Sequence, residues 1–162
     1  MPGLVFGEFY RDGLPALRQA FEQLTFMEDS TKSALIRGSV QMGMGIMSAD
    51  PTGSYEWMRE SVSAEQFAET FANAIGTWAR TDFNAAGAWL GRQPSSPERD
   101  AAMSTFARTV ASIDPEAAAT WAASIDDEQT RSKAINVTLG YWKRTDAKAA
   151  KEWEDRNGPD QD

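Results

Sequence analysis

The sequence contains no cysteine and no histidine. Without cysteine the chain has no disulfide, no zinc–thiolate site and no cysteine nucleophile. Without histidine it has no Ser-His-Asp triad and no imidazole-bound metal. We therefore predict no catalytic residue, no metal ligand and no cofactor, although a pair of Asp or Glu side chains remains an open route to hydrolysis.

Basic residues and long apolar runs are also scarce. The chain has 16 Lys and Arg against 24 Asp and Glu, a formal net charge of -8. A broad nucleic-acid surface needs clustered cations that replace counterions, so this balance argues against nucleic acid as a partner. No apolar run approaches the roughly 18 residues of a membrane-spanning helix, and no basic leader is visible, so we expect no membrane insertion. The compartment stays open between the cytoplasm and the periplasm after signal removal.

An internal repeat is the strongest pattern in the 162 residues. Four aspartates and four tryptophans recur every 32 residues, and each tryptophan follows its aspartate by seven positions: Asp50, Asp82, Asp114 and Asp146, with Trp57, Trp89, Trp121 and Trp153. A second similarity spans 64 residues, since the segment from Gly76 to Asp82 resembles the segment from Gly140 to Asp146. We therefore predict one repeat domain over 1–162, with units 10–29, 30–61, 62–93, 94–125 and 126–157 and a tail at 158–162.

Each unit is predicted to contain two helices. The aspartate is the expected N-cap of the shorter one, and Pro51 and Pro115 follow at the first helical position, where no N–H is needed. The longer helix precedes the aspartate and carries apolar or small residues at positions -12, -11, -8, -7 and -4, a helical spacing. Ser96 is a predicted N-cap, Ser63 with Gln66 resembles a capping box, and Gly158 with the following proline is a predicted stop.

The pattern predicts an all-α fold, a right-handed α-solenoid of about four and a half two-helix repeats with about nine helices. Such hairpins bury their apolar faces only by stacking. The architecture resembles tetratricopeptide and HEAT repeats, although Leu139-Gly140 matches the tetratricopeptide pattern only once. The unit more closely resembles Trp-x-x-x-Asp-Pro-x-x-Ala-x-x-Trp repeats of uncharacterised bacterial proteins. That resemblance implies a bacterial origin and a scaffold role, but names no partner.

Several residues have two interpretations. The repeated tryptophans are expected in the core rather than as stacking platforms for ligands, with Trp153 the most exposed of them. The repeated aspartates are expected as helix caps rather than as a cation site. Arg80 and Arg144 either complement helix dipoles or bind an acidic partner. Arg99 and Arg131 are expected to pair with acids of neighbouring helices, and the methionines near position 44 to fill the core or to form an adaptable contact surface.

A candidate binding face follows from positions -13, -9, -5 and -2 of the longer helices, which point away from the predicted core. Gly76 and Gly140 are expected on the same face, where they would either let a ligand backbone come close or relieve crowding on the inside of the curve. We expect this face to bind a protein or peptide without catalysis. The alternatives are a spacer or fragment of a larger bacterial solenoid, with exposed apolar surface around Trp153, and a hydrolase that uses an Asp/Glu pair. The candidate binding residues are Gln41, Asn73, Thr77, Arg80, Thr105, Thr109, Tyr141 and Arg144.

Overall fold

The repeated aspartates each begin a helix. In the computed structural model, which describes residues 46–158 and the isolated positions 15, 19, 31, 34 and 38, each aspartate carboxylate accepts a hydrogen bond from the backbone N–H three residues later. These bonds are 2.9–3.0 Å long. The predicted caps are confirmed, and the helices that they begin are α4 (Pro51–Ser61), α6 (Phe83–Leu90), α8 (Pro115–Ala123) and α10 (Ala147–Asn157).

Other helices precede these four. They are α3 (Ile46–Ala49), α5 (Ala64–Thr81), α7 (Pro97–Val110) and α9 (Glu128–Thr145). The apolar stripe predicted for the long helices is buried in α5 and α7, and in α9 all of its positions are buried except Ile135, which is half-buried. The described residues therefore form eight helices and no strand, which confirms the all-α prediction. The predicted first unit, 10–29, lies outside the described residues apart from its isolated positions.

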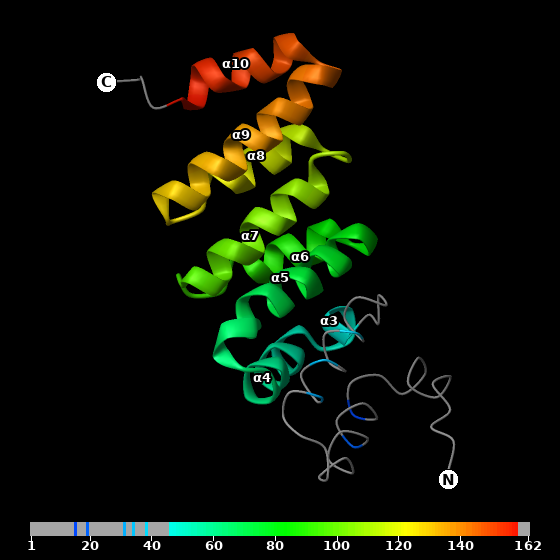
Figure 1. Ribbon diagram of the computed structural model, residues 1–162. Helices are drawn as coiled ribbons and strands as arrows, with labels where there is room; N and C mark the ends of the chain where they lie inside the picture. Colours follow the sequence, from blue (N-terminus) through cyan, green and yellow to red (C-terminus); the bar gives the residue numbers. More distant parts are fainter. Residues whose placement is uncertain are drawn as a thin grey trace.

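The long helices follow one another through the molecule. Helix α5 packs against α7, and α7 packs against α9. The two inner shorter helices pack between their sequence neighbours: α6 contacts α5 and α7, and α8 contacts α7 and α9. In Figure 1 the helices rise in this order from α4 to α10, which lies across the far end.

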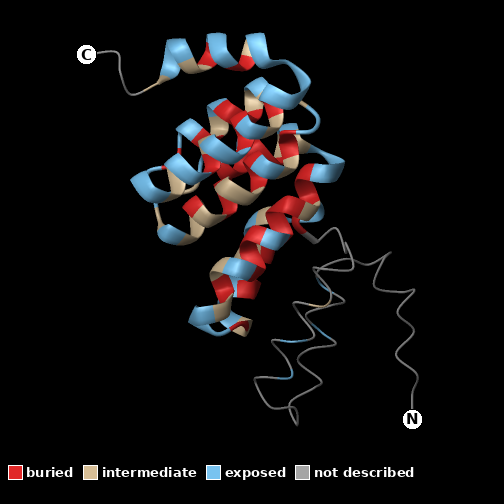
Figure 2. Ribbon diagram, turned by 45° about the horizontal axis from the view of Figure 1, so that its top comes forward, coloured by how far each residue is buried: buried red, intermediate tan, exposed pale blue. Residues whose placement is uncertain are grey.

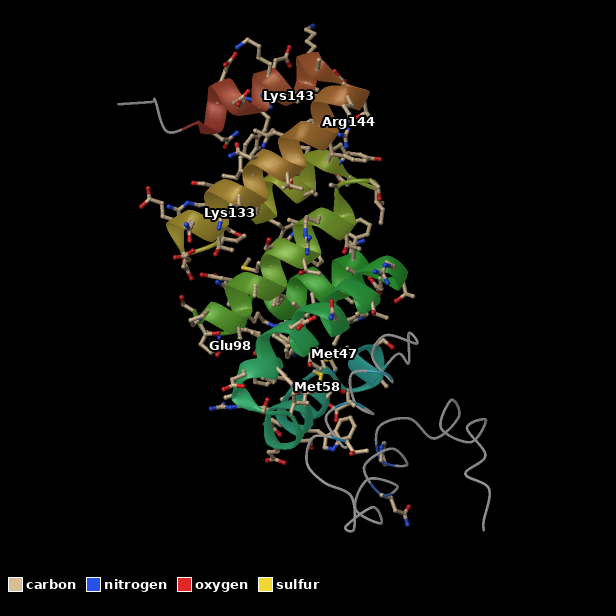
Figure 3. The ribbon with its side chains drawn as sticks, in the orientation of Figure 1. Met47, Met58, Glu98, Lys133, Lys143 and Arg144 are labelled. Carbon is tan, nitrogen blue, oxygen red and sulfur yellow. The ribbon has the colours of Figure 1, made fainter. Side chains whose placement is uncertain are left out.

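The buried side chains fall into two clusters. The larger one runs from Met47 in α3 to Ala134 in α9, and it appears as the red interior in Figure 2. Met47 is 2% exposed and lies near Met58 (Figure 3). Of the two interpretations given for the methionines in this segment, Met47 therefore fits core filling and not an adaptable contact surface. The smaller cluster joins α8, α9 and α10 and consists of Ala119, Leu139, Trp142, Ala150 and Trp153.

The repeated tryptophans belong to the core. Trp57, Trp89 and Trp153 are buried, and Trp121 is half-buried with its ring centroid 5.2 Å from that of Phe106. The expectation that Trp153 is the most exposed of the four was wrong, because it is only 4% exposed and packs in the smaller cluster.

Trp121 packs against two glycines, one in α6 and one that caps the end of α6. A Cβ atom added at Gly87 would lie 2.9 Å from Cζ2 of Trp121, and one at Gly91 would lie 3.1 Å from Cη2 of the same ring. The indole therefore occupies space that only glycine leaves free at these two positions. The helical pattern alone did not predict this contact.

The remaining helix starts are held in different ways. Ser96 caps α7 through a hydrogen bond from the Arg99 backbone N–H to its hydroxyl, 3.1 Å long. The capping box predicted at Ser63 was wrong. Its side chain makes no capping hydrogen bond, and its backbone carbonyl accepts the N–H group of Gln66 instead.

A buried carboxylate ties α7 to the start of α9. Asp100 is 5% exposed and accepts hydrogen bonds from the backbone N–H groups of Asp126 (3.3 Å) and Asp127 (2.8 Å). Arg99 pairs with Asp126 at 3.1 Å, as expected for an arginine beside a neighbouring acid. Arg131 does not pair with an acid as expected. It donates to the carbonyl oxygens of Ile125 and Asp126, and so satisfies the turn before its own helix.

Candidate functional site

An open hollow of about 520 Å³ lies over the outer face of α5 and α7. Helix α5 contributes residues from its second half, and α7 contributes residues from its last turns and from the turn that follows. The lining residues are Asn73, Arg80, Thr105, Arg108, Thr109, Ser112 and Ile113. We call this feature the α5–α7 hollow.

Half of the predicted binding residues line the α5–α7 hollow: Asn73, Arg80, Thr105 and Thr109. These four come from two helices and lie up to 36 residues apart in the sequence. Their agreement with the predicted face arises because the helices stack through their apolar stripes, so that the opposite polar faces come to lie side by side.

The other predicted residues lie outside this hollow. Thr77 is half-buried on α5 and does not line it. Tyr141 and Arg144 lie on α9, where the guanidinium carbon of Arg144 is 5.5 Å from the Tyr141 ring centroid, a cation–π contact. Figure 3 shows Lys133 near the start of α9 and Arg144 near its end, so this helix extends the polar face beyond the hollow. Gln41 lies outside the described residues.

Close packing of α5 and α7 sets the floor of the hollow. A Cβ atom at Gly76 would lie 3.0 Å from Cγ2 of Thr105 and 3.5 Å from Oγ1 of Thr109. Gly76 is buried, so it does not face a ligand; it lets α7 approach α5, in agreement with its other interpretation, the relief of crowding. Gly140 is exposed, and a Cβ atom there would have no heavy atom within 4 Å, so its position agrees with the expectation.

Two lining residues were missed by the sequence pattern, Arg108 and Ile113. Arg108 lies six positions before Asp114, the place that Gly76 and Gly140 hold in their own units. A comparison of the units at that position would have found a charged side chain in place of glycine. Ile113 lies in the turn before Asp114 and is 53% exposed, although the helical stripe gave no reason to expect an apolar residue there.

The hydroxyl groups of the hollow are held by local hydrogen bonds. The Thr109 hydroxyl donates to the carbonyl oxygen of Thr105 at 2.9 Å. The Arg108 guanidinium donates to the Thr105 hydroxyl at 3.2 Å, and the Ser112 hydroxyl lies 3.4 Å from the Thr109 carbonyl oxygen. These bonds orient the side chains while each hydroxyl oxygen keeps a free acceptor position.

The α5–α7 hollow is positively charged. Arg80 and Arg108 line it, no acidic side chain does, and within the described part of the chain neither arginine forms an ion pair. Since the whole chain has a net charge of -8, this is a local reversal of sign.

Carboxylates elsewhere in the structure serve the fold. Asp100 is the one buried acid among the described residues, and both of its oxygens accept backbone N–H groups. Asp127 caps α9 by accepting from the Thr130 backbone N–H at 2.7 Å. Hydrogen bonds from the side chain and backbone of Thr130, with the charges of Lys133 and Arg131, hold the pKa of Asp127 below its usual range. Across 46–158, no three acidic side chains gather as a metal site would require.

Within the described residues, no helix combines the length and the apolar character needed to cross a bilayer. No protein-family model, no curated protein and no solved structure matches the chain.

Proposed function

We propose that this protein is a non-catalytic scaffold that binds an extended peptide, or an extended segment of another protein, across the outer face of α5, α7 and α9. The observation that carries the proposal is the α5–α7 hollow, an open depression of about 520 Å³ lined by side chains from two successive long helices. Its lining is mixed in character, with cations, hydroxyl groups, one amide and one exposed isoleucine, as is typical of surfaces that recognise peptides.

We further propose that the helices form a right-handed α-solenoid with a period of 32 residues, similar to tetratricopeptide and HEAT repeats. Three observations support this architecture. The capped short helices begin at 32-residue intervals, each long helix packs against the next long helix, and each inner short helix packs between two long ones. A stack of this kind presents one continuous face along the long helices, which suits an extended ligand better than a compact one.

Peptide display can test the proposal without a known partner. The full chain is immobilised, a random dodecapeptide library is selected against it, and enriched peptides are synthesised for affinity measurement. We expect enriched peptides to lose binding to Ser112→Trp, because a bulky ring at this lining position fills the hollow. Thr120→Trp is the matched control, since Thr120 is an exposed hydroxyl residue on α8 that does not line the hollow.

Two results would count against the proposal. If no peptide is enriched, the face does not recognise extended peptides, and the spacer alternative becomes the better explanation of the chain. If the enriched peptides bind Ser112→Trp as well as they bind the original protein, recognition occurs elsewhere. Circular dichroism and thermal melting of both variants show whether a lost signal comes from lost folding.

A further inference from the structure

The two arginines of the α5–α7 hollow have most of their hydrogen-bonding capacity unused. Arg80 lies in the last turn of α5 and Arg108 in the last turn of α7, where each positive charge complements a helix dipole. That interaction does not consume the five N–H donors of a guanidinium group. Arg108 donates to the Thr105 hydroxyl, and among the described residues Arg80 has no side-chain hydrogen bond or ion pair.

Arginines elsewhere on the long helices are engaged by the fold. Arg99 pairs with Asp126, Arg131 donates to two carbonyl oxygens, and Arg144 covers the Tyr141 ring. Arg80 and Arg108, the arginines of the long helices that are not engaged in this way, both line the α5–α7 hollow. A guanidinium group binds a carboxylate through two parallel N–H···O bonds, which gives direction as well as attraction.

An apolar contact lies beside the two cations. Ile113 is 53% exposed and lines the same hollow, and it is one of two large hydrophobic residues that are so exposed in the described part of the chain. A segment that satisfies both features would carry carboxylates next to an apolar side chain. The hydroxyl groups of Thr109 and Ser112 would accept backbone N–H groups of such a segment.

We infer that the segment bound by this face is an acidic peptide whose carboxylates pair with Arg80 and Arg108 while a neighbouring apolar side chain covers Ile113. This inference rests on the proposed function and specifies its ligand. It also makes an unusual claim, because a chain with a net charge of -8 should attract basic peptides if bulk charge alone decided the preference. The local site and the overall charge therefore predict opposite results.

Three synthetic peptides separate these predictions. Each is a fluorescein-labelled decapeptide with one central leucine and a glycine-rich backbone, and they differ only in carrying four glutamates, four glutamines or four lysines. Fluorescence anisotropy with the full chain measures each affinity at moderate ionic strength. We expect the glutamate peptide to bind at least about tenfold more tightly than the other two. This ratio corresponds to the combined binding free energy of two exposed or partly exposed ion pairs.

Matched charge variants then locate the contact. Arg80→Gln/Arg108→Gln should weaken the glutamate peptide by about tenfold and leave the glutamine peptide unchanged. Arg59→Gln/Arg92→Gln removes the same charge from two exposed arginines outside the hollow and should change neither peptide. Arg80→Glu/Arg108→Glu should bind the lysine peptide more tightly than the glutamate peptide. Loss of folding cannot produce this new binding.

The outcomes distinguish the inference from the function on which it rests. If the lysine or glutamine peptide binds the original protein as tightly as the glutamate peptide, the acidic preference is wrong. The same holds if the two glutamine double variants behave alike. In either case the proposed function still stands if display-selected peptides lose binding to Ser112→Trp. If those peptides also ignore Ser112→Trp, the function and the inference fail together.

Discussion

Two helical glycines, Gly87 in α6 and Gly140 in α9, have opposite surroundings. A Cβ atom at Gly87 would lie 2.9 Å from Cζ2 of Trp121 and 3.0 Å from Cζ of Phe106, and two aromatic rings cannot both move aside cheaply. A Cβ atom at Gly140 would contact nothing within 4 Å. An added methyl group is therefore expected to cause overpacking at Gly87, whereas at Gly140 it changes only the helix propensity.

Alanine substitutions at these two positions should change stability in opposite directions. Gly87→Ala should lower the free energy of unfolding by about 1–2 kcal/mol, because the overpacking exceeds the gain in helix propensity. Gly140→Ala should raise it by about 0.5–1 kcal/mol, because alanine replaces an exposed glycine inside a helix. Urea denaturation measures both values. A loss of stability at Gly140 would mean that its surface is covered after all, and no loss at Gly87 would contradict the Trp121 packing.

Residues that act within one helix could be predicted from the sequence. The four aspartates and the buried stripes depend on spacing along a single helix, so their period reports their roles directly. Gly87 and Arg108 could not be predicted in this way. The partner of Gly87 is a tryptophan 34 positions later, and Arg108 matters through a hollow shared with α5, so both roles exist only after the helices have packed.

At the scale of the element, the start of α9 combines a cap with nearby charges. Asp127 accepts the Thr130 backbone N–H, and hydrogen bonds from the side chain and backbone of Thr130, with Lys133 and Arg131, lower the pKa of Asp127 from its ordinary value of 3.8. A pKa that is lower in the folded state stabilises the fold when the group is ionised. This contribution is present above about pH 3.8 and is lost as the pH falls through the lower folded-state pKa.

Asp127→Asn should therefore be less stable than the original protein near neutral pH, and the difference in stability should become smaller in acid. The variant keeps a cap oxygen but has no charge, so its melting temperature should lie below that of the original protein near neutral pH, and the gap should close as the pH approaches about 2. Thermal melting followed by circular dichroism across this range measures the gap. Thr130→Val, which removes the hydroxyl group beside the carboxylate, should reproduce part of the change. A gap that stays constant with pH would show that the charge of Asp127 contributes nothing.

Helix starts also show where prediction by motif succeeds and where it fails. Ser96 and Ser63 both precede a long helix, but only the Ser96 hydroxyl accepts the capping N–H. The backbone carbonyl of Ser63 accepts the N–H group of Gln66, whereas the corresponding N–H group of Arg99 donates to the Ser96 hydroxyl. Sequence motifs name residues able to cap, whereas the entry angle of the chain decides which group does so.

At the scale of the molecule, the repeat pattern predicted the helical class and the order of the helices but not how the core divides. The buried residues form a large cluster from α3 to α9 and a small one that joins α8, α9 and α10. Trp153 was expected to be the most exposed of the four tryptophans because charged residues flank it and no further repeat covers it, yet it packs with Trp142 and Leu139. Burial of this residue depends on how α10 folds back over α9, and neighbours in sequence carry no information about that angle.

The division of the core predicts that α10 opens separately from α5 and α7. Besides the small cluster, α10 is held by the surface pairs Lys143–Glu154 (2.8 Å) and Arg156–Glu116 (3.9 Å), which contribute at most about 1 kcal/mol each. Trp153→Ala should remove about 3 kcal/mol or more from the packing of α10, because a large buried ring is lost from a cluster of few members.

Hydrogen exchange resolved by residue or peptide can test this division. In Trp153→Ala the amides of α10 should exchange much faster than in the original protein, while those of α5 and α7 keep nearly their original protection, because local opening costs less than global unfolding. Lys148→Ala, which removes only the exposed contact with Glu152, should leave exchange in both regions almost unchanged. If exchange of the α5 amides accelerates as much as that of the α10 amides, the two clusters unfold as one unit. The stability of α5 and α7 then depends on the packing of α10.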